Sequence, residues 1–338
     1  MATIRDVAKL AGVSVATVSR VINQSGYVNK QTEDKILESM HQLQYTPNTL
    51  ARGLANKKTD SIALIIPNIT NPFFPELVQA VEDAASRYGY TLLLGNSYNS
   101  EENALQYVQI FKNRFVDGVL IFASHQFDSK DVSEIDKIEI PTVVIDKALD
   151  NNQIFSAKNR NFTGATMAVE HLQSIGCKHI AHIRGPEKLY PARERFRGYH
   201  DTLQKTGEFR SSYVEQGDFS MESGLAATMR LLDKHPEIDG IFAANDLMAA
   251  GSLKALQRKG KKVPDEVALI GYDGIHLLEM FEPEISTIAI PIYDIGNAAV
   301  SVLIDQINGK ESRFGIHSNI MDEFDVQLIQ RASTIKTK

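Results

Sequence analysis

From Ser61 onward, short apolar runs alternate with amphipathic stretches of helical spacing. This alternating pattern occurs twice. The first set of apolar runs is IALIIP, TLLLGN, DGVLIFA and TVVID, and the second set, after Gly164, is HIAHIRG, VEQGDF, GIFAAND and VALIGYDG. Strands that alternate with helices in this way form parallel sheets covered by helices. Two successive α/β units of about 100–130 residues each predict a bilobed body of two doubly wound parallel-sheet subdomains.

Before Ser61 the pattern is that of a small all-α unit. The segment TIRDVAKLAGVSVATVSRVINQSG predicts a helix, a tight turn at Gly12 and a second helix that begins at Val15. Thr3 can cap the first helix, with Asp6 in the capping-box position, and Ser14 can cap the second. Two short capped helices around a glycine turn are typical of a helix-turn-helix headpiece.

A third helix is expected from about Thr32 to Leu43, and it should pack on the first two through residues at helical spacing: Ile36, Leu37, Met40 and Leu43. Pro47 then breaks the chain. Residues 48–56 are competent to form a helix, but so short a helix is marginal alone. We therefore expect a headpiece over residues 1–46 and a hinge helix with linker over residues 47–60.

The net charge of −6 is unevenly distributed. Residues 1–59 hold eight of the 36 Lys and Arg residues and four of the 42 Asp and Glu residues, which leaves 28 basic and 38 acidic residues in the body. The headpiece together with its hinge and linker is therefore basic, and the body is acidic. Because nucleic acid binding depends on neutralising phosphate charge, the headpiece is the expected nucleic-acid surface.

Composition also restricts the location of the protein. No apolar run approaches the roughly 20 residues that a membrane span requires. The N-terminus, MATIRDVAKL, has no signal-peptide pattern. A single cysteine, Cys177, rules out an intramolecular disulfide framework and fits a reducing compartment. We expect a cytoplasmic protein with no membrane partner.

Six sequence blocks, in order along the chain, resemble the LacI/GalR family of bacterial transcription repressors. They are DVAKLAGVSVATVSRVIN at 6–23, YTPNTLARGL at 45–54, NPFF at 71–74, NDLMAAG at 245–251, IGYDG at 270–274 and RAST at 331–334. NITNPFFPEL and the RGP…RFRGY segment are most similar to Gram-positive ribose-type members. The resemblance implies a repressor whose body has the periplasmic-binding-protein-like fold. In that fold, two lobes are joined by three crossings of the chain.

The resemblance also implies the lobe boundaries, with crossings near residues 161, 290 and 320. The N-terminal effector-binding subdomain would comprise residues 61–160 with 291–320, and the C-terminal one residues 161–290 with 321–331. Because the chain ends at RASTIKTK without a leucine heptad, we expect a homodimer. Such a dimer would read a palindromic operator.

In the family, the first two residues of the second helix reach base edges. Here they are Val15 and Ala16, which can touch a thymine methyl group but cannot form a bidentate hydrogen bond. Arg20, one turn further on, is the best candidate for a guanine contact. The remaining polar positions are expected to anchor phosphates: Thr3, Ser14, Thr17, Ser19 and Asn23. The alternative is a purely structural three-helix unit with a solvated Arg20.

The hinge segment NTLARGLAN is the second expected DNA contact. The resemblance places Leu54 in the minor groove as a wedge between base steps. Asn48 and Arg52 would lie against DNA beside it. The alternative is that Leu54 makes an apolar contact within the chain.

Ligands of doubly wound sheets bind at the C-terminal ends of the strands. Polar residues fall there after four of the predicted strands: Asn71, Asp146, Asn245, Asp246 and Asp273. With aromatic walls for the C–H face of a sugar and Arg195 as a donor, the expected effector set is Asn71, Phe73, Phe74, Asp146, Lys147, Arg195, Phe219, Asn245 and Asp273. Each acid at a strand end could instead cap the next helix.

Three positions depart from the ribose-type pattern. Lys147 stands where Arg is usual and lacks the bidentate guanidinium fork. Ile290 stands where Gln is frequent, which removes a hydrogen-bonding partner. Arg160 stands where Asp is frequent, near a predicted crossing. The losses at Lys147 and Ile290 predict a pocket that holds a sugar other than free ribose, or holds ribose less tightly. From the family resemblance, the effector is expected to be a small sugar, ribose or a close relative, either neutral or phosphorylated.

Competing functions remain to be weighed. Asp146 with Asp273 could serve as a glycosidase pair, yet no nucleophile elbow, P-loop or dinucleotide fingerprint is present, so neither an enzyme nor a cofactor is expected. A metal site could be drawn from His171, Cys177, His179 and His182, but His179 and His182 fall on opposite faces of a strand. A secreted sugar receptor would lack the basic headpiece. A phosphoprotein corepressor in place of an inducer sugar stays open.

Overall fold

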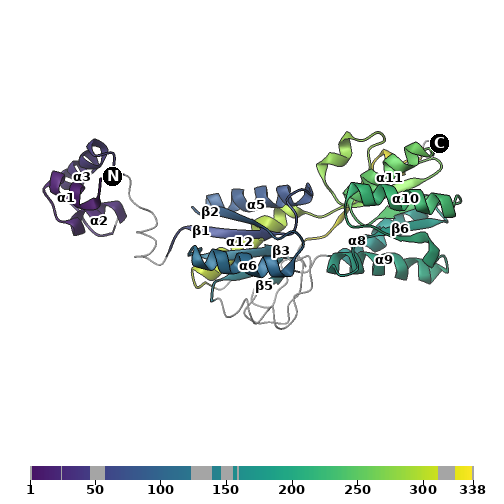
Figure 1. Cartoon of the computed structure of the whole chain (residues 1–338), viewed down its shortest axis with the longest axis horizontal. Helices are drawn as coiled ribbons and strands as arrows, with labels where there is room; N and C mark the ends of the chain where they lie inside the picture. Colours follow the sequence, from purple (N-terminus) through teal and green to yellow (C-terminus); the bar gives the residue numbers. More distant parts are fainter. Residues whose placement is uncertain are drawn as a thin grey trace. The chain divides into compact units, whose positions relative to one another are not determined.

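The computed structural model describes residues 2–23, 25–45, 58–122, 139–145, 155–157, 160–310 and 324–336 (Figure 1). The chain divides into two compact units, Met1–Thr59 and Asp60–Lys338. None of the described helices is long and apolar enough to cross a membrane.

The headpiece contains three described helices: α1 (Ile4–Ala11), α2 (Val15–Asn23) and α3 (Lys30–Gln42). Val7, Ala8, Val18 and Ile36 are buried at their meeting point. As predicted, Gly12 adopts the left-handed conformation (φ 68°) that ends α1, and the second helix begins at Val15.

Side-chain caps fix where these helices begin. The backbone N–H and Oγ1 of Thr3 both donate to the Asp6 carboxylate, at 2.8 and 2.7 Å, and these bonds lower the pKa of Asp6. The Thr17 N–H donates to Ser14 Oγ at 3.1 Å. The third helix begins two residues earlier than predicted, because Asn29 caps it by accepting from the Gln31 N–H.

The prediction that Leu37 belongs to the core of the headpiece is wrong. Leu37 is 50% exposed, whereas its neighbour Ile36 is fully buried. Adjacent residues of an α-helix lie about 100° apart around its axis, so the stripe that contains Ile36 and Met40 turns Leu37 away from the core.

The first lobe of the body is a five-stranded parallel sheet in its described part, with the order β2-β1-β3-β4-β5. Its strands are β1 (Ser61–Ile66), β2 (Thr91–Asn96), β3 (Gly118–Phe122), β4 (Thr142–Ile145) and β5 (Phe155–Ala157). Its helices are α5 (Phe73–Arg87), α6 (Glu101–Asn113) and α12 (Ile292–Ile307).

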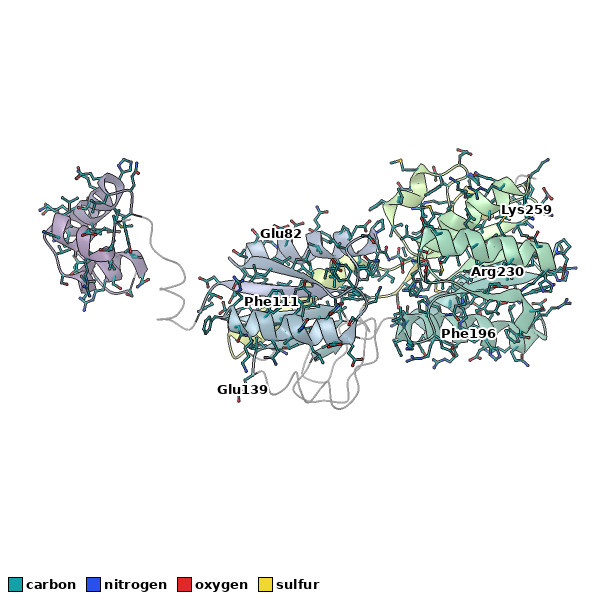
Figure 2. All side chains as sticks on the ribbon, in the orientation of Figure 1. Glu82, Phe111, Glu139, Phe196, Arg230 and Lys259 are labelled. Carbon is teal, nitrogen blue, oxygen red and sulfur yellow. The ribbon has the colours of Figure 1, made fainter. Side chains whose placement is uncertain are left out.

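The strand β1 explains how both faces of this sheet are covered. Alternate side chains of a strand point to opposite faces. Ile62, Leu64 and Ile66 belong to the cluster that contains the buried residues of α5 and α12. Ala63 and Ile65 pack instead in the cluster of α6, which includes Phe111 (Figure 2).

The second lobe has the strand order β11-β10-β9-β8-β6-β7. Its strands are β6 (Ile180–Arg184), β7 (Val214–Gln216), β8 (Gly240–Ala243), β9 (Ala268–Asp273), β10 (Ser286–Ala289) and β11 (Gln327–Ile329). Its helices are α8 (Asn161–Ser174), α9 (Tyr190–Thr206), α10 (Met221–Lys234) and α11 (Asp246–Arg258), with short 3-10 turns η1 (Ser211–Tyr213), η2 (His276–Met280) and η4 (Ala332–Thr334). α8 contacts α9, and α10 contacts α11 (Figure 1).

The chain passes between the lobes more than once. α8, which follows β5, packs in the second lobe, and α12, which follows β10, packs against α5 of the first. β11 then pairs with β10 in the second lobe, antiparallel to it, whereas the other described pairs of that sheet are parallel. The antiparallel edge strand was not anticipated from the sequence.

Candidate ligand cavity and DNA-reading helix

A cavity of about 350 Å³ lies at the C-terminal ends of strands from both sheets. This volume is near the lower end of the roughly 300–1,000 Å³ that small-molecule sites occupy. The first lobe lines it with Asn68, Thr70, Asn71, Phe73, Phe74, Asn99 and Phe122. The second lobe lines it with Leu189, Pro191, Arg195, Asp218, Phe219, Ser220, Met221, Glu222, Asn245, Leu247, Asp273 and Ile290.

The structure brings seven of the nine sequence-predicted effector residues together at this one cavity: Asn71, Phe73, Phe74, Arg195, Phe219, Asn245 and Asp273. The other two, Asp146 and Lys147, lie outside the described residues, directly after β4. Residues from sequence positions more than 200 apart therefore line one site.

Three phenylalanines form one wall of the cavity. The rings of Phe73, Phe74 and Phe122 pack edge to face, with centroids 5.2 to 5.8 Å apart. Asn71 sets the turn into α5, because its Oδ1 accepts from the Phe73 N–H at 3.1 Å. Phe122 was not among the predicted effector residues, although it is the last residue of the apolar run VLIF and so ends a parallel strand.

Phe219 supplies an aromatic side chain from the second lobe. Its backbone has φ +71°, in the left-handed region. A Cβ at Gly185 would lie 2.3 Å from the Phe219 ring, so only glycine allows this close approach. The Phe219 carbonyl accepts from Asn245 Nδ2 at 3.0 Å, which ties this loop to α11.

Arg195, on α9, is buried and already oriented by the protein. Its Nε donates to Asn161 Oδ1 at 2.8 Å, and its Nη1 donates to the Ala244 carbonyl at 2.6 Å and to Asp273 Oδ1 at 2.9 Å. The guanidinium also lies 3.8 Å from the centroid of the Tyr272 ring. A guanidinium held on both edges and one face keeps a single orientation toward the cavity.

Asp273 forms a buried ion pair with Arg195 at the end of β9. Burial raises the pKa of Asp273 to about 6, although the Arg195 charge acts in the opposite direction. Asp273 also has φ +123°, a strained value for a residue with a side chain. Strain of this kind at a ligand-facing residue is typical of functional sites.

Asp246 does not line the cavity, contrary to its candidate role at a strand end. Its Oδ2 accepts from the backbone N–H groups of Gly274 and Ile275, and its Oδ1 accepts from Thr287 Oγ1. Burial, together with the charge of Asp273, raises its pKa well above the ordinary value. Asp246 therefore fixes the loop that follows Asp273.

Asn245 has two roles, although the sequence offered the helix cap as an alternative only for the acids. Its Oδ1 accepts from the Met248 N–H at 2.9 Å, so it caps α11. The same residue lines the cavity. A helix cap and a ligand contact are compatible because the amide group has several hydrogen-bonding positions.

Asp218, Ser220 and Glu222 also line the cavity and were missed. Desolvation alone would raise the pKa of the exposed Asp218 side chain, but hydrogen bonds from Ser220 and Ser223 lower it overall. A signal was available, because these residues lie at the end of the predicted run VEQGDF or just after it, and β7 covers Val214–Gln216 of that run. The pattern of a short strand with a capped helix after it does not by itself say which side chains reach a cavity.

The exposed surface of α2 agrees with a DNA-reading role. Val15, Ala16 and Arg20 are exposed. Ser14 and Thr17 hydroxyls lie 2.8 Å apart in the cap, and Asn23 Nδ2 donates to Ser19 Oγ at 3.1 Å. The hinge residues Asn48, Arg52 and Leu54 lie outside the described residues.

The candidate metal ligands have other partners. His171 Nε2 lies 2.9 Å from Thr334 Oγ1, and the Cys177 thiol donates to the Asp239 carbonyl. His182 Nδ1 donates to the Phe242 carbonyl, and burial lowers its pKa to about 3. The described residues contain no group of three or more His, Cys, Asp or Glu side chains arranged to hold a metal ion.

The structure describes the surroundings of two of the three residues that depart from the ribose-type pattern. Ile290 lines the cavity. Arg160 forms an ion pair with Asp325 at 2.7 Å, so it links the segment before α8 to the segment before β11. The third departure, Lys147, lies outside the described residues.

Comparisons with known proteins agree with this geometry. Two family models match: "Bacterial regulatory proteins, lacI family" over residues 3–48, and "Periplasmic binding proteins and sugar binding domain of LacI family" over residues 59–331. The ribose operon repressor of Halalkalibacterium halodurans is 43% identical over 310 residues, which are 92% of each protein. The ribose operon repressor of Bacillus subtilis is 37% identical and covers 90% of this chain and 91% of that protein.

A similar solved structure is the lac repressor dimer bound to operator and the anti-inducer ONPF. It has a TM-score of 0.87 and 27% sequence identity, and the match covers 99% of each chain. The architecture of a helix-turn-helix headpiece and a bilobed body therefore matches along the whole chain.

Proposed function

Because this chain belongs to the LacI family of transcriptional repressors, we propose that it represses a sugar-utilisation operon and is released from its operator by a small sugar, ribose or a close relative. The observation that carries the proposal is the cavity, in which a phenylalanine wall faces the Arg195–Asp273 ion pair. Aromatic faces suit the C–H surface of a sugar, and charged hydrogen-bonding groups suit its hydroxyls.

The names of the relatives support the choice of sugar. Both ribose operon repressors match about nine tenths of this chain. These relatives are regulators and not enzymes, so we propose no catalytic role for Asp273. A DNA-binding regulator acts where the chromosome is, and we propose a cytoplasmic location.

We further propose that the protein acts as a homodimer on a palindromic operator, through Val15, Ala16 and Arg20 of α2 and the hinge residues Asn48, Arg52 and Leu54. Thr3, Ser14, Thr17, Ser19 and Asn23 would contact phosphates. The lac repressor structure, a dimer on its operator, supports this assembly. Two-fold symmetry in a dimer imposes two-fold symmetry on its DNA site.

Sugar contacts on both lobes would favour the closed arrangement of the cavity in proportion to the difference in affinity between the two arrangements. Linkage then requires that operator weaken sugar binding by the same factor by which sugar weakens operator binding. Measuring sugar affinity with and without saturating operator gives one factor, and measuring operator affinity with and without sugar gives the other.

The test uses the full chain. Operators would be selected from a pool of random duplexes, and the fluorescence anisotropy of a selected duplex would be followed while D-ribose is added. We expect release of the duplex. If no pentose or hexose released it, and operator binding instead required a phosphoprotein, the repressor would be driven by a corepressor.

A variant tests the reading helix. Arg20→Ala should lose about 1–3 kcal/mol of operator binding for each base contact removed, while sugar binding stays unchanged. An equal loss on operator and on random DNA would make Arg20 a phosphate contact.

A further inference from the structure

The cavity has fewer basic than acidic side chains in its lining. Among its described lining residues, Arg195 is the one basic side chain, and Asp218, Glu222 and Asp273 are acidic. The Arg195 charge is balanced by its ion pair with Asp273 at 2.9 Å. The described lining therefore has an excess of negative charge before any ligand enters.

The helix N-termini at the cavity already have caps or acidic residues beside them. A helix N-terminus attracts anions when its N–H groups are free. At α5, the Phe73 N–H donates to Asn71 Oδ1, and at α11 the Met248 N–H donates to Asn245 Oδ1. Both helices also carry an acid in the first turn, Glu76 and Asp246 respectively.

The remaining two helices at the cavity are no better suited to an anion. At α10, the Ser223 N–H donates to Ser220 Oγ, and Glu222 lies in the first turn. The Ser220 N–H before it is already bound by Asp218 Oδ1 at 2.9 Å. At α9, Pro191 lies in the first turn and has no N–H to donate.

We propose that the cavity selects an uncharged polyhydroxy ligand and rejects the phosphate ester of the same sugar. This inference rests on the proposed function, in that a small sugar is the effector, and it defines the charge of that sugar. Like charges brought together in a partly buried site oppose binding, whereas hydroxyl groups both donate to carboxylates and accept from guanidinium groups.

The ion pair supplies the two hydrogen-bonding positions that a pair of hydroxyls needs. Within the described part of the chain, hydrogen bonds occupy Nε and Nη1 of Arg195 and Oδ1 of Asp273. Arg195 Nη2 and Asp273 Oδ2 remain as a donor and an acceptor, and both residues line the cavity. Glu222 and Asp218 add acceptors that a phosphate group could not use.

The experiment compares D-ribose with D-ribose 5-phosphate by calorimetry on the full chain at pH 7.5. We expect D-ribose to bind at least about 100-fold more tightly than its phosphate. Glu222→Gln removes one lining charge and should narrow that preference by about five-fold. Glu170→Gln removes the same charge from an exposed position on α8 outside the cavity, and should leave the preference unchanged.

The outcomes separate the inference from the proposed function. Equal or tighter binding of D-ribose 5-phosphate, for instance through Lys147, would overturn the inference and leave a sugar-responsive repressor. A preference that Glu222→Gln and Glu170→Gln change equally would overturn the electrostatic cause. If neither compound bound, and no other pentose or hexose did, the proposed function would fail and the inference with it.

Discussion

In the first lobe, the described side chains that line the cavity are uncharged amides, a threonine and phenylalanines, whereas the second lobe supplies all the charged ones. The phenylalanines of the first lobe are also core residues, because Phe73, Phe74 and Phe122 are buried among strands and helices. In the second lobe, Asp218 and Glu222 are exposed, and Arg195 with Asp273 is buried.

This difference separates two kinds of site residue. Changing the aromatic wall also changes the packing of the lobe, so ligand recognition and stability are coupled there. Exposed lining acids can change with little effect on folding, since surface substitutions usually alter stability by less than about 0.5 kcal/mol. We therefore expect ligand specificity to be adjusted mainly in the second lobe.

The largest expected effect tests the coupling in the first lobe. Phe74→Ala should lower the free energy of unfolding by about 3–5 kcal/mol, because it leaves a cavity in a packed cluster. It should also weaken D-ribose binding. Phe111, equally buried but on the other side of the sheet, is the matched control.

Phe111→Ala should lower the free energy of unfolding, measured in urea, by a similar amount, while the folded protein keeps its D-ribose affinity. If the two variants bound D-ribose equally well, the aromatic wall would be core alone, and the comparison between the lobes would fail.

The next effect concerns the second lobe. Asp273→Ala should weaken D-ribose binding by about 100-fold, because it removes a charged acceptor. Operator binding should persist, so the variant should be a repressor that no longer responds to sugar. Calorimetry and operator anisotropy on the same preparation would check both, and normal induction of the variant would exclude Asp273 from the ligand site.

The pH dependence should be smaller. Burial raises the pKa of Asp273 to about 6, so its carboxylate is protonated as the pH falls through this value. If a ligand hydroxyl donates to the carboxylate, D-ribose affinity at pH 5 should be about tenfold lower than above pH 7. Asp273→Asn should remove this dependence, and an unchanged profile in that variant would assign it to another group.

Stability should respond to the same group in the opposite sense. The pKa of Asp273 is higher in the folded chain than its ordinary value of 3.8, so the folded state binds the proton more tightly. Its contribution to stability is fully present below about pH 4 and is lost as the pH rises through about 6. Urea unfolding of the native chain and of Asp273→Asn between pH 5 and 7 would isolate this contribution.

The smallest effect belongs to neither lobe alone. The Arg160–Asp325 ion pair is partly exposed, and a double-mutant cycle with Arg160→Ala and Asp325→Ala should give a coupling of about 0.2–1 kcal/mol in unfolding. A much larger coupling would show that the connections between the lobes, and not the lobes themselves, dominate the energetics of the body.

The local patterns of the sequence were enough to predict the fold class. Caps at Thr3 and Ser14, the turn at Gly12 and the alternation of strands with helices depend on residues a few positions apart, and the structure has these features. The cavity location also followed from the sequence, because parallel strands end at one edge of a sheet and the polar residues at their ends must meet there.

Only the tertiary structure decided what each of those polar residues does. Asp246 and Asp273 both occur near strand ends, yet Asp246 binds backbone groups 28 and 29 residues away, whereas Asp273 pairs with Arg195 across 78 residues. The charge of the cavity, the Phe122 wall and the partner of Arg160 depend on similar long-range contacts. A hydrogen bond is set by distances in space, and a pattern in the sequence fixes those distances only within one helix, turn or strand.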